Sequence, residues 1–196
     1  MKALGQQSVA SLVKTALVVA WWVLWFAAAA LVVIAVGYLI VMVMDPQWLD
    51  HQHGHIVFGG PGRGSMTVNF DDPGGWTWPI FVPALLIGGV AVAGALMIVW
   101  RLRKLFDSFS SGEPFRRENA NHLRAIWIIM MIIELSRYVL FAVTGLLITI
   151  FGGPNVQAHY EFNVDLSTWG AILILIVLAE VFREGARMKE EQELTI

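Results

Sequence analysis

The sequence contains no cysteine and little charge. Without cysteine, the chain can form no disulfide and offers no thiolate for a metal or redox centre. Charged residues make up only 14% of the 196 residues, whereas hydrophobic residues make up 57%. Soluble domains carry about 25% charged residues. The composition therefore excludes an ordinary soluble domain and indicates a membrane protein.

Most hydrophobic residues lie in long apolar segments, namely Leu17–Met44, Pro79–Trp100, Ala125–Phe151 and Leu166–Phe182. A helix rises about 1.5 Å per residue, so each segment is long enough, or nearly so, to cross a hydrocarbon core of about 30 Å. The first is too long for the core of a signal peptide, and we expect it to be an uncleaved span. With helical extensions, the expected spans are about 17–44, 79–106, 116–151 and 166–190, and the expected loops are 45–78, 107–115 and 152–165. The sequence thus predicts an all-α integral membrane protein with four transmembrane helices in a single domain.

Two of these loops alternate apolar and polar residues, which is typical of half-buried strands. The alternation covers Met66–Phe70 and His159–Leu166, and a glycine-rich stretch can turn Ile56–Phe58 back onto Met66–Phe70. We therefore predict a small extracytoplasmic β-sheet formed by the first and third loops. Its helix-facing residues would be Tyr160, Phe162, Val164 and Leu166, and its water-facing residues Glu161, Asn163 and Asp165.

Lysine and arginine are distributed unevenly about the apolar segments. All thirteen except Arg63 and Arg137 lie near the N-terminus, within 101–124 or beyond the fourth segment. Loops 45–78 and 152–165 together hold only Arg63, against six Asp and Glu residues. Because Lys and Arg are enriched in cytoplasmic loops, we expect both termini and loop 107–115 to be cytoplasmic.

Tryptophan side chains prefer the headgroup zone of a membrane. Four of them lie at the predicted outer boundaries, namely Trp48, Trp76, Trp78 and Trp169. Trp100 and Trp127 lie near the inner boundaries, and Trp21, Trp22 and Trp25 lie less close to them. Their positions favour the same topology.

Two stretches of the sequence resemble a known family. One is Gly112–Asn119 (Gly-Glu-Pro-Phe-Arg-Arg-Glu-Asn) and the other is Phe182–Ile196. With four spans around them, the chain resembles, over nearly its whole length, the bacterial membrane proteins called domain of unknown function 2975. The resemblance implies a multi-pass protein of the bacterial cytoplasmic (inner) membrane and transfers no catalytic residue. Relatives are commonly encoded beside small helix-turn-helix regulators, which implies a signalling role. Where the family often has Ser or Thr after Pro-Phe, this chain has Arg116, which offers no capping oxygen.

Glu134 and Arg137 are ionisable residues inside the third apolar segment. Glu134 lies about 15 Å along a helix from Arg124, near the middle of the membrane. Ionisable groups at that depth are costly unless paired, and at a spacing of three these two can neutralise each other. We interpret them as an intramembrane ion pair, either structural or acting as a gate, proton relay or switch. Glu180 is a further candidate partner of Arg137.

Histidines are concentrated in the predicted outer loops, at His51, His53, His55 and His159. Alternating imidazoles in an extended segment point the same way and could bind zinc, copper or nickel. A metal-free histidine-rich loop and a proton-sensing loop are the alternatives.

A set of cations flanks the predicted inner surface, namely Arg101, Arg103, Lys104, Arg116, Arg117, Arg124, Arg183 and Arg187. Such a set binds either anionic lipid headgroups or an acidic partner protein.

No loop holds a nucleophile beside a base, and we therefore expect no enzymatic activity, no catalytic residue and no cofactor. The sequence favours a regulator or scaffold that binds a cytoplasmic regulator protein through loop 107–115 and the C-terminal tail, without contacting nucleic acid directly. The alternatives are a small transporter or channel that uses Glu134 and Arg137, and a metal-binding or sensing protein that uses the histidines. The small residues Ala84, Gly88, Ala91 and Ala95 either pack within the chain or form the seam of a homo-oligomer.

Overall fold

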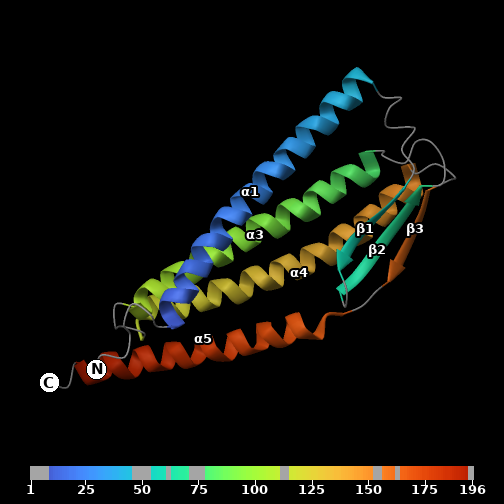
Figure 1. Ribbon diagram of the computed structural model, residues 1–196. Helices are drawn as coiled ribbons and strands as arrows, with labels where there is room; N and C mark the ends of the chain where they lie inside the picture. Colours follow the sequence, from blue (N-terminus) through green and yellow to red (C-terminus); the bar gives the residue numbers. More distant parts are fainter. Residues whose placement is uncertain are drawn as a thin grey trace. The chain divides into compact units, whose positions relative to one another are not determined.

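The computed structural model describes residues 9–45, 54–60, 63–70, 78–110, 115–151, 156–161 and 164–193. The elements, labelled in Figure 1, are α1 (Val9–Met44), β1 (Gly54–Gly60), β2 (Arg63–Phe70), α3 (Trp78–Ser110), α4 (Arg117–Phe151), β3 (Val156–Glu161) and α5 (Leu166–Glu193). By length and composition, four helical stretches in the described chain can cross a membrane, namely Leu12–Met44, Trp78–Phe109, Arg117–Phe151 and Leu166–Gln192. The prediction of a nearly all-helical chain with four membrane-capable helices is confirmed.

Proline residues mark two of the helix boundaries. The helix α1 ends at Met44, just before Asp45 and Pro46, because a residue that precedes proline disfavours helical geometry. The helix α3 begins at Trp78, one residue before Pro79, in the first turn where a missing amide hydrogen breaks no helical bond.

The chain divides into two compact units, which are described separately below. Unit 1 comprises Met1–Ala27, Val92–Ile133 and Ser167–Ile196, and unit 2 comprises Ala28–Ala91 and Glu134–Leu166. The division crosses α1, α3 and α4. Each of these helices therefore contributes one part to each unit.

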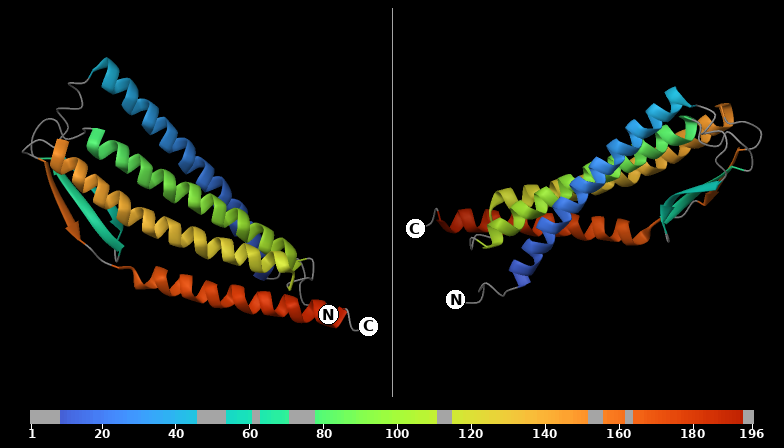
Figure 2. Two further views of the ribbon diagram at one scale, coloured as in Figure 1. Left: turned by 180° about the vertical axis from the view of Figure 1, so that it is seen from behind. Right: turned by 45° about the horizontal axis from the view of Figure 1, so that its top comes forward.

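Unit 2 contains a three-stranded antiparallel sheet in the order β1-β2-β3, which is labelled in Figure 1 and seen from two further sides in Figure 2. Val68 on β2 pairs with Ile56 on β1 and with Ala158 on β3. The Val68 side chain is fully buried against Ile80 of α3 and Ile148 of α4. The sheet therefore packs on the unit 2 parts of α3 and α4. Its placement outside the membrane stays a prediction.

The residues after β3 differ from the predicted alternation. β3 ends at Glu161, and Val164 and Leu166 are 41% and 79% exposed, whereas Asp165 is buried. The prediction that Val164 and Leu166 face the helices and Asp165 faces water is therefore wrong. A period of two applies only to extended chain, and Leu166 already opens α5. Asp165 occupies the position before that helix, where aspartate is a favoured cap. The side chains of Tyr160 and Glu161, and all of Phe162 and Asn163, lie outside the described residues.

Helix packing within unit 2 uses one glycine of the small-residue stripe. A Cβ atom on Gly88 of α3 would lie 3.2 Å from Leu31 Cδ2 of α1. On the same pair of helices, the ring of Tyr38 stacks on Phe81 with centroids 3.7 Å apart. Gly88 thus contributes to helix packing within the chain, which is one of the two hypotheses for the small residues of α3. The homo-oligomer stays a prediction.

Helix packing within unit 1 depends on a different glycine. A Cβ atom on Gly94 of α3 would lie 2.7 Å from Ile133 Cγ1 and 3.6 Å from Ile129 Cγ2, both on α4. The helices approach closely because glycine has no side chain at this position.

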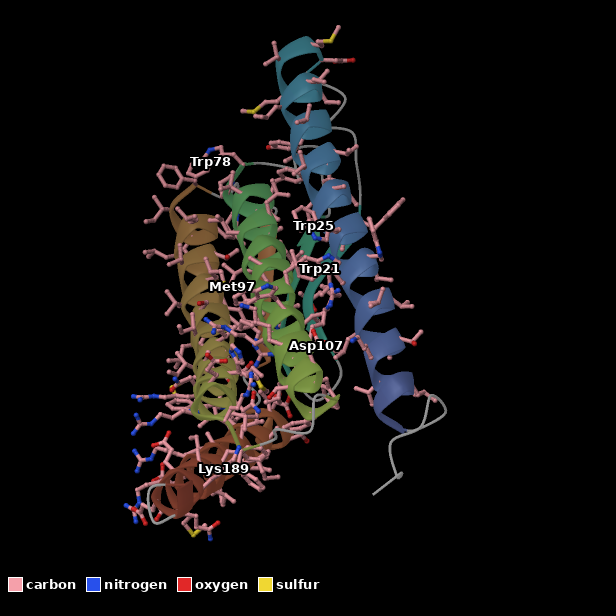
Figure 3. All side chains as sticks on the ribbon, turned by 90° about the vertical axis from the view of Figure 1, so that its left-hand side faces the viewer. Trp21, Trp25, Trp78, Met97, Asp107 and Lys189 are labelled. Carbon is pink, nitrogen blue, oxygen red and sulfur yellow. The ribbon has the colours of Figure 1, made fainter. Side chains whose placement is uncertain are left out.

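The helix α1 also contacts α3 within unit 1. The guanidinium of Arg103 lies 5.5 Å from the ring centroid of Trp21, which Figure 3 labels beside α3. Lys14 Nζ lies 2.7 Å from Asp107 Oδ1. Many large apolar side chains of α1 remain exposed, among them Phe26 at 82%. Such a surface suits contact with lipid rather than water.

Candidate functional site

Unit 1 brings together the last turns of α3, the first turns of α4 and the last half of α5. These parts are joined by a cluster of buried apolar side chains, Leu105 of α3, Leu123 of α4 and Ala179 of α5. The three helices continue past their apolar segments into charged sequence. All eight cations predicted at the inner surface lie on unit 1, within Val92–Ile133 and Ser167–Ile196.

A pocket of about 660 Å³ opens between the end of α3 and the start of α4. We call it the polar pocket. It is lined by Arg101, Lys104, Asp107, Ser108, Arg116, Glu118, Asn119, Asn121 and His122.

Asn119 holds the wall of the polar pocket in place. Its side chain is 1% exposed, and its Nδ2 atom donates a hydrogen bond to Ser108 Oγ at 2.8 Å. Its backbone N–H donates to the Arg116 carbonyl oxygen at 3.0 Å and closes the turn that leads into α4. Asn119 thus joins the start of α4 to the end of α3, at the place where Arg116 cannot supply a side-chain cap.

The cations of the polar pocket are oriented by their neighbours. Arg101 Nη1 donates a hydrogen bond to His122 Nδ1 at 3.2 Å. The Arg101 guanidinium lies 4.9 Å from the ring centroid of Trp100, and Lys104 Nζ lies 4.0 Å from it. Cation–π contacts of this kind hold a cation over an aromatic face. The charge of Asp107 is compensated by Lys14 at 2.7 Å.

An aromatic contact joins the segment before α4 to α5. The ring of Phe115 lies 5.6 Å from the ring of Phe182, which stacks on Phe109 at 5.8 Å. Gly185 leaves room for Phe115, because a Cβ atom there would lie 2.7 Å from Phe115 Cδ1. Phe115 belongs to the first stretch that carries the family resemblance, and Phe182 and Gly185 belong to the second. The structure therefore places these two stretches in contact.

Charged residues of α5 lie beside this contact. Arg117 Nε of α4 lies 3.8 Å from Glu190 Oε1, and both side chains are largely exposed. A second pocket of about 400 Å³ is lined by Phe115, Arg116, Arg117, Glu118, Ala186, Lys189 and Glu190. We call it the tail groove. Its lining combines charges of both signs with one aromatic side chain, Phe115.

The other predicted cations lie outside these two pockets. Arg187 lies 2.7 Å from Glu184 and 3.4 Å from Glu191, and Arg183 contacts Glu180. Arg124 lines a pocket of about 280 Å³ with Glu180 and Arg183. Exposed ion pairs such as those of Arg183 and Arg187 contribute little to stability.

Glu134 and Arg137 form an ion pair in the unit 2 part of α4. Arg137 Nη2 lies 2.5 Å from Glu134 Oε1, and Glu134 is 4% exposed. The Tyr138 hydroxyl donates to the same carboxylate oxygen at 3.1 Å. Arg137 Nε has no hydrogen-bond partner among the described residues. Glu180, the other candidate partner of Arg137, contacts Arg183 on α5.

The predicted metal ligands are only partly described. His51 and His53 lie outside the described residues. His55 pairs with Asn69 in the sheet, and His159, which is exposed, pairs with Thr67. Within the described ranges, no group of three or more His, Asp or Glu side chains is placed to hold a metal. A metal site that includes His51 and His53 stays a prediction.

Sequence reasoning missed the polar members of the pocket, above all His122 and Asn119. The run Arg116–His122 is polar along its length except for Ala120, and this polarity was the available indication. Their partners Arg101 and Ser108 lie 21 and 11 residues away. The packing of α4 against α3 brings each pair together, and the sequence alone does not show this packing.

Comparison with known proteins shows the family of this chain. A family model described as "Protein of unknown function (DUF2975)" matches residues 76–196. No curated protein and no solved structure matches the chain. The matched region is more than half of the chain, and it contains the polar pocket, the tail groove and the contact between Phe115 and Gly185. This chain belongs to the DUF2975 family of proteins of unknown function.

Proposed function

We propose that this protein is a non-enzymatic regulator or scaffold of the bacterial inner membrane. It binds a cytoplasmic partner protein through the segment before α4 and the C-terminal part of α5. The observation that carries the proposal is the contact of Phe115 with Phe182 and Gly185, because it joins two segments that are distant in sequence into one surface. The positive-inside bias assigns that surface to the cytoplasm.

The chemistry of the tail groove supports a protein partner. Phe115 is 45% exposed, and it is surrounded by Arg117, Lys189 and Glu190. An exposed aromatic ring with charges of both signs around it is typical of protein interfaces, in which the aromatic side chain provides affinity and the charges provide specificity. A small helix-turn-helix regulator is the partner class that the family resemblance implies.

In the same proposal, the loops that carry the three-stranded sheet are extracytoplasmic, because loops 45–78 and 152–165 hold only one cation. The sheet would bind or sense an external factor, and the helices α3 and α4 continue from the sheet-bearing unit into unit 1.

Removing residues 189–196 is expected to reduce capture of the partner by about tenfold, which corresponds to about 1.4 kcal/mol. This truncation removes Lys189 and Glu190 from the tail groove but retains Gly185 and the buried Ala186. The measurement is affinity capture from native membranes with quantitative mass spectrometry, followed by direct binding of the purified partner.

The matched control removes only residues 194–196, which follow the last residue of α5. Capture by this variant should equal that of the full chain. Equal capture by the longer truncation would exclude the tail as the docking element.

A second candidate function is a small transporter or channel. The specific observation is the buried Glu134, which accepts hydrogen bonds from Arg137 and Tyr138. Beside it lies Arg137 Nε, which has no hydrogen-bond partner in the part of the chain that the structure describes. Ionisable groups inside spans often mark ion pathways. If the chain conducts protons or ions in liposomes, Glu134→Gln should abolish the flux and Glu180→Gln, at an exposed carboxylate, should preserve it. Absence of flux through the unaltered protein would exclude this function.

A further inference from the structure

The polar pocket has an excess of positive charge. Three cations line it. Arg101 and Lys104 lie on α3, and Arg116 is the residue just before α4. Of its two carboxylates, Asp107 is compensated by Lys14, which leaves Glu118. Three cations therefore face one carboxylate that Lys14 does not compensate. The net charge favours an anionic ligand.

The side chains of the pocket are suited to phosphate oxygens. Arginine has five N–H donors, and Arg101 uses one of its Nη1 donors on His122, so its guanidinium is oriented while other donors remain. Lys104 adds a second charged donor. Asn121, which is exposed at the rim, adds an uncharged one. Hydrogen bonds from Arg and Lys to phosphate are charge-assisted and are stronger than neutral ones.

Trp100 sets the depth of the pocket relative to the membrane. It is the last residue of the apolar segment, and its side chain is 40% exposed. Its ring lies under both Arg101 and Lys104, at 4.9 and 4.0 Å. Because indole rings prefer the headgroup zone, the two cations lie at the level of lipid phosphates. The pocket volume of about 660 Å³ is within the range of small-molecule sites.

From these observations we propose that the polar pocket binds the phosphate group of an anionic phospholipid, with Arg101, Lys104 and Arg116 as its cationic ligands. The inference concerns a different surface from the tail groove that carries the proposed function. Its test needs no partner protein, and either proposal can fail while the other stands.

The test is native mass spectrometry of the full chain, titrated with phosphatidylglycerol and with phosphatidylcholine. Phosphatidylglycerol should bind more tightly, because it carries a net negative charge. Lys104→Gln should weaken phosphatidylglycerol binding by about fivefold, as expected for one cation at a membrane surface. The control Arg103→Gln removes the same charge from the adjacent residue, which lies over Trp21 and does not line the pocket. It should leave binding nearly unchanged.

Glu118→Gln provides a test in the opposite direction. It removes the pocket carboxylate that Lys14 does not compensate, and phosphatidylglycerol binding should become about fivefold tighter. Lys104 and Glu118 are both exposed, so the Lys104→Gln and Glu118→Gln variants should fold like the unaltered chain.

Three results of these titrations would overturn the proposal. One is equal binding of the two lipids by the unaltered chain. Another is equal loss of binding in Lys104→Gln and Arg103→Gln, which would indicate diffuse attraction to the surface. The third is weaker binding in Glu118→Gln.

Competition separates lipid from soluble sources of phosphate. Glycerol 3-phosphate and inorganic phosphate should fail to displace phosphatidylglycerol at equal concentration. Displacement by either one would assign the pocket to a soluble phosphate compound and overturn the lipid assignment.

Discussion

Replacing Arg137 by methionine is expected to destabilise the protein by about 3–5 kcal/mol, the usual cost of removing one partner of a buried ion pair. Glu134 is 4% exposed and its carboxylate lies 2.5 Å from Arg137 Nη2. Without the guanidinium, the Tyr138 hydroxyl would remain as a hydrogen-bond donor to that oxygen, and the negative charge would be left without a cation beside it. The measurement is the free energy of unfolding in bicelles, obtained by steric trapping.

The double variant Glu134→Leu with Arg137→Met is the matched control. A buried ion pair can often be replaced by apolar residues of similar volume at little cost, so the double variant should recover most of the lost stability. If both variants lose the same stability, the pair does not act as a unit, and the loss in Arg137→Met would come from packing alone.

Replacing Gly94 by leucine is the second large effect, with an expected loss of about 1–3 kcal/mol from overpacking. A Cβ atom at this position would already lie 2.7 Å from Ile133 Cγ1. A leucine side chain would therefore displace the Ile133 side chain or push α3 and α4 apart within unit 1. The midpoint of thermal unfolding in mild detergent, together with the bicelle measurement, reports this loss.

Gly89→Leu is the control on the same helix. No atom lies within 4 Å of a Cβ built on Gly89, and leucine is a better helix former than glycine by up to about 1 kcal/mol. The two substitutions should therefore shift the midpoint in opposite directions. Equal destabilisation would show that the close approach at Gly94 is not what limits packing.

Much of the secondary structure could be predicted from sequence. Each predicted apolar run lies inside one of the four membrane-capable helices, because the requirement to span a hydrocarbon core acts on each segment separately. The helix α1 begins at Val9, well before the expected start at residue 17. The strand alternation at Met66–Phe70 lies inside β2. The alternation at 159–166 was extended too far, because the same polarity pattern also fits the cap and first residue of α5.

The candidate site could be predicted only in outline. The cations Arg101, Lys104 and Arg116 are visible as an excess of positive charge between two apolar segments. The sequence does not show which cations line the pocket and which lie on the surrounding surface. Adjacent residues such as Arg103 and Lys104 point in different directions on a helix. His122 and Asn119 were missed because nothing local relates them to α3.

Some features of this protein follow from the sequence alone, and others depend on the tertiary structure. The membrane-capable helices, the charge asymmetry and the pairing of Glu134 with Arg137 could all be read from the residues, because hydropathy, charge and helical spacing are local properties. The contacts of Arg101 with His122 and of Phe115 with Gly185 required the fold. They depend on how each helix is rotated against its neighbours, and in lipid that rotation is set by van der Waals packing and interhelical hydrogen bonds rather than by a hydrophobic pattern along the chain.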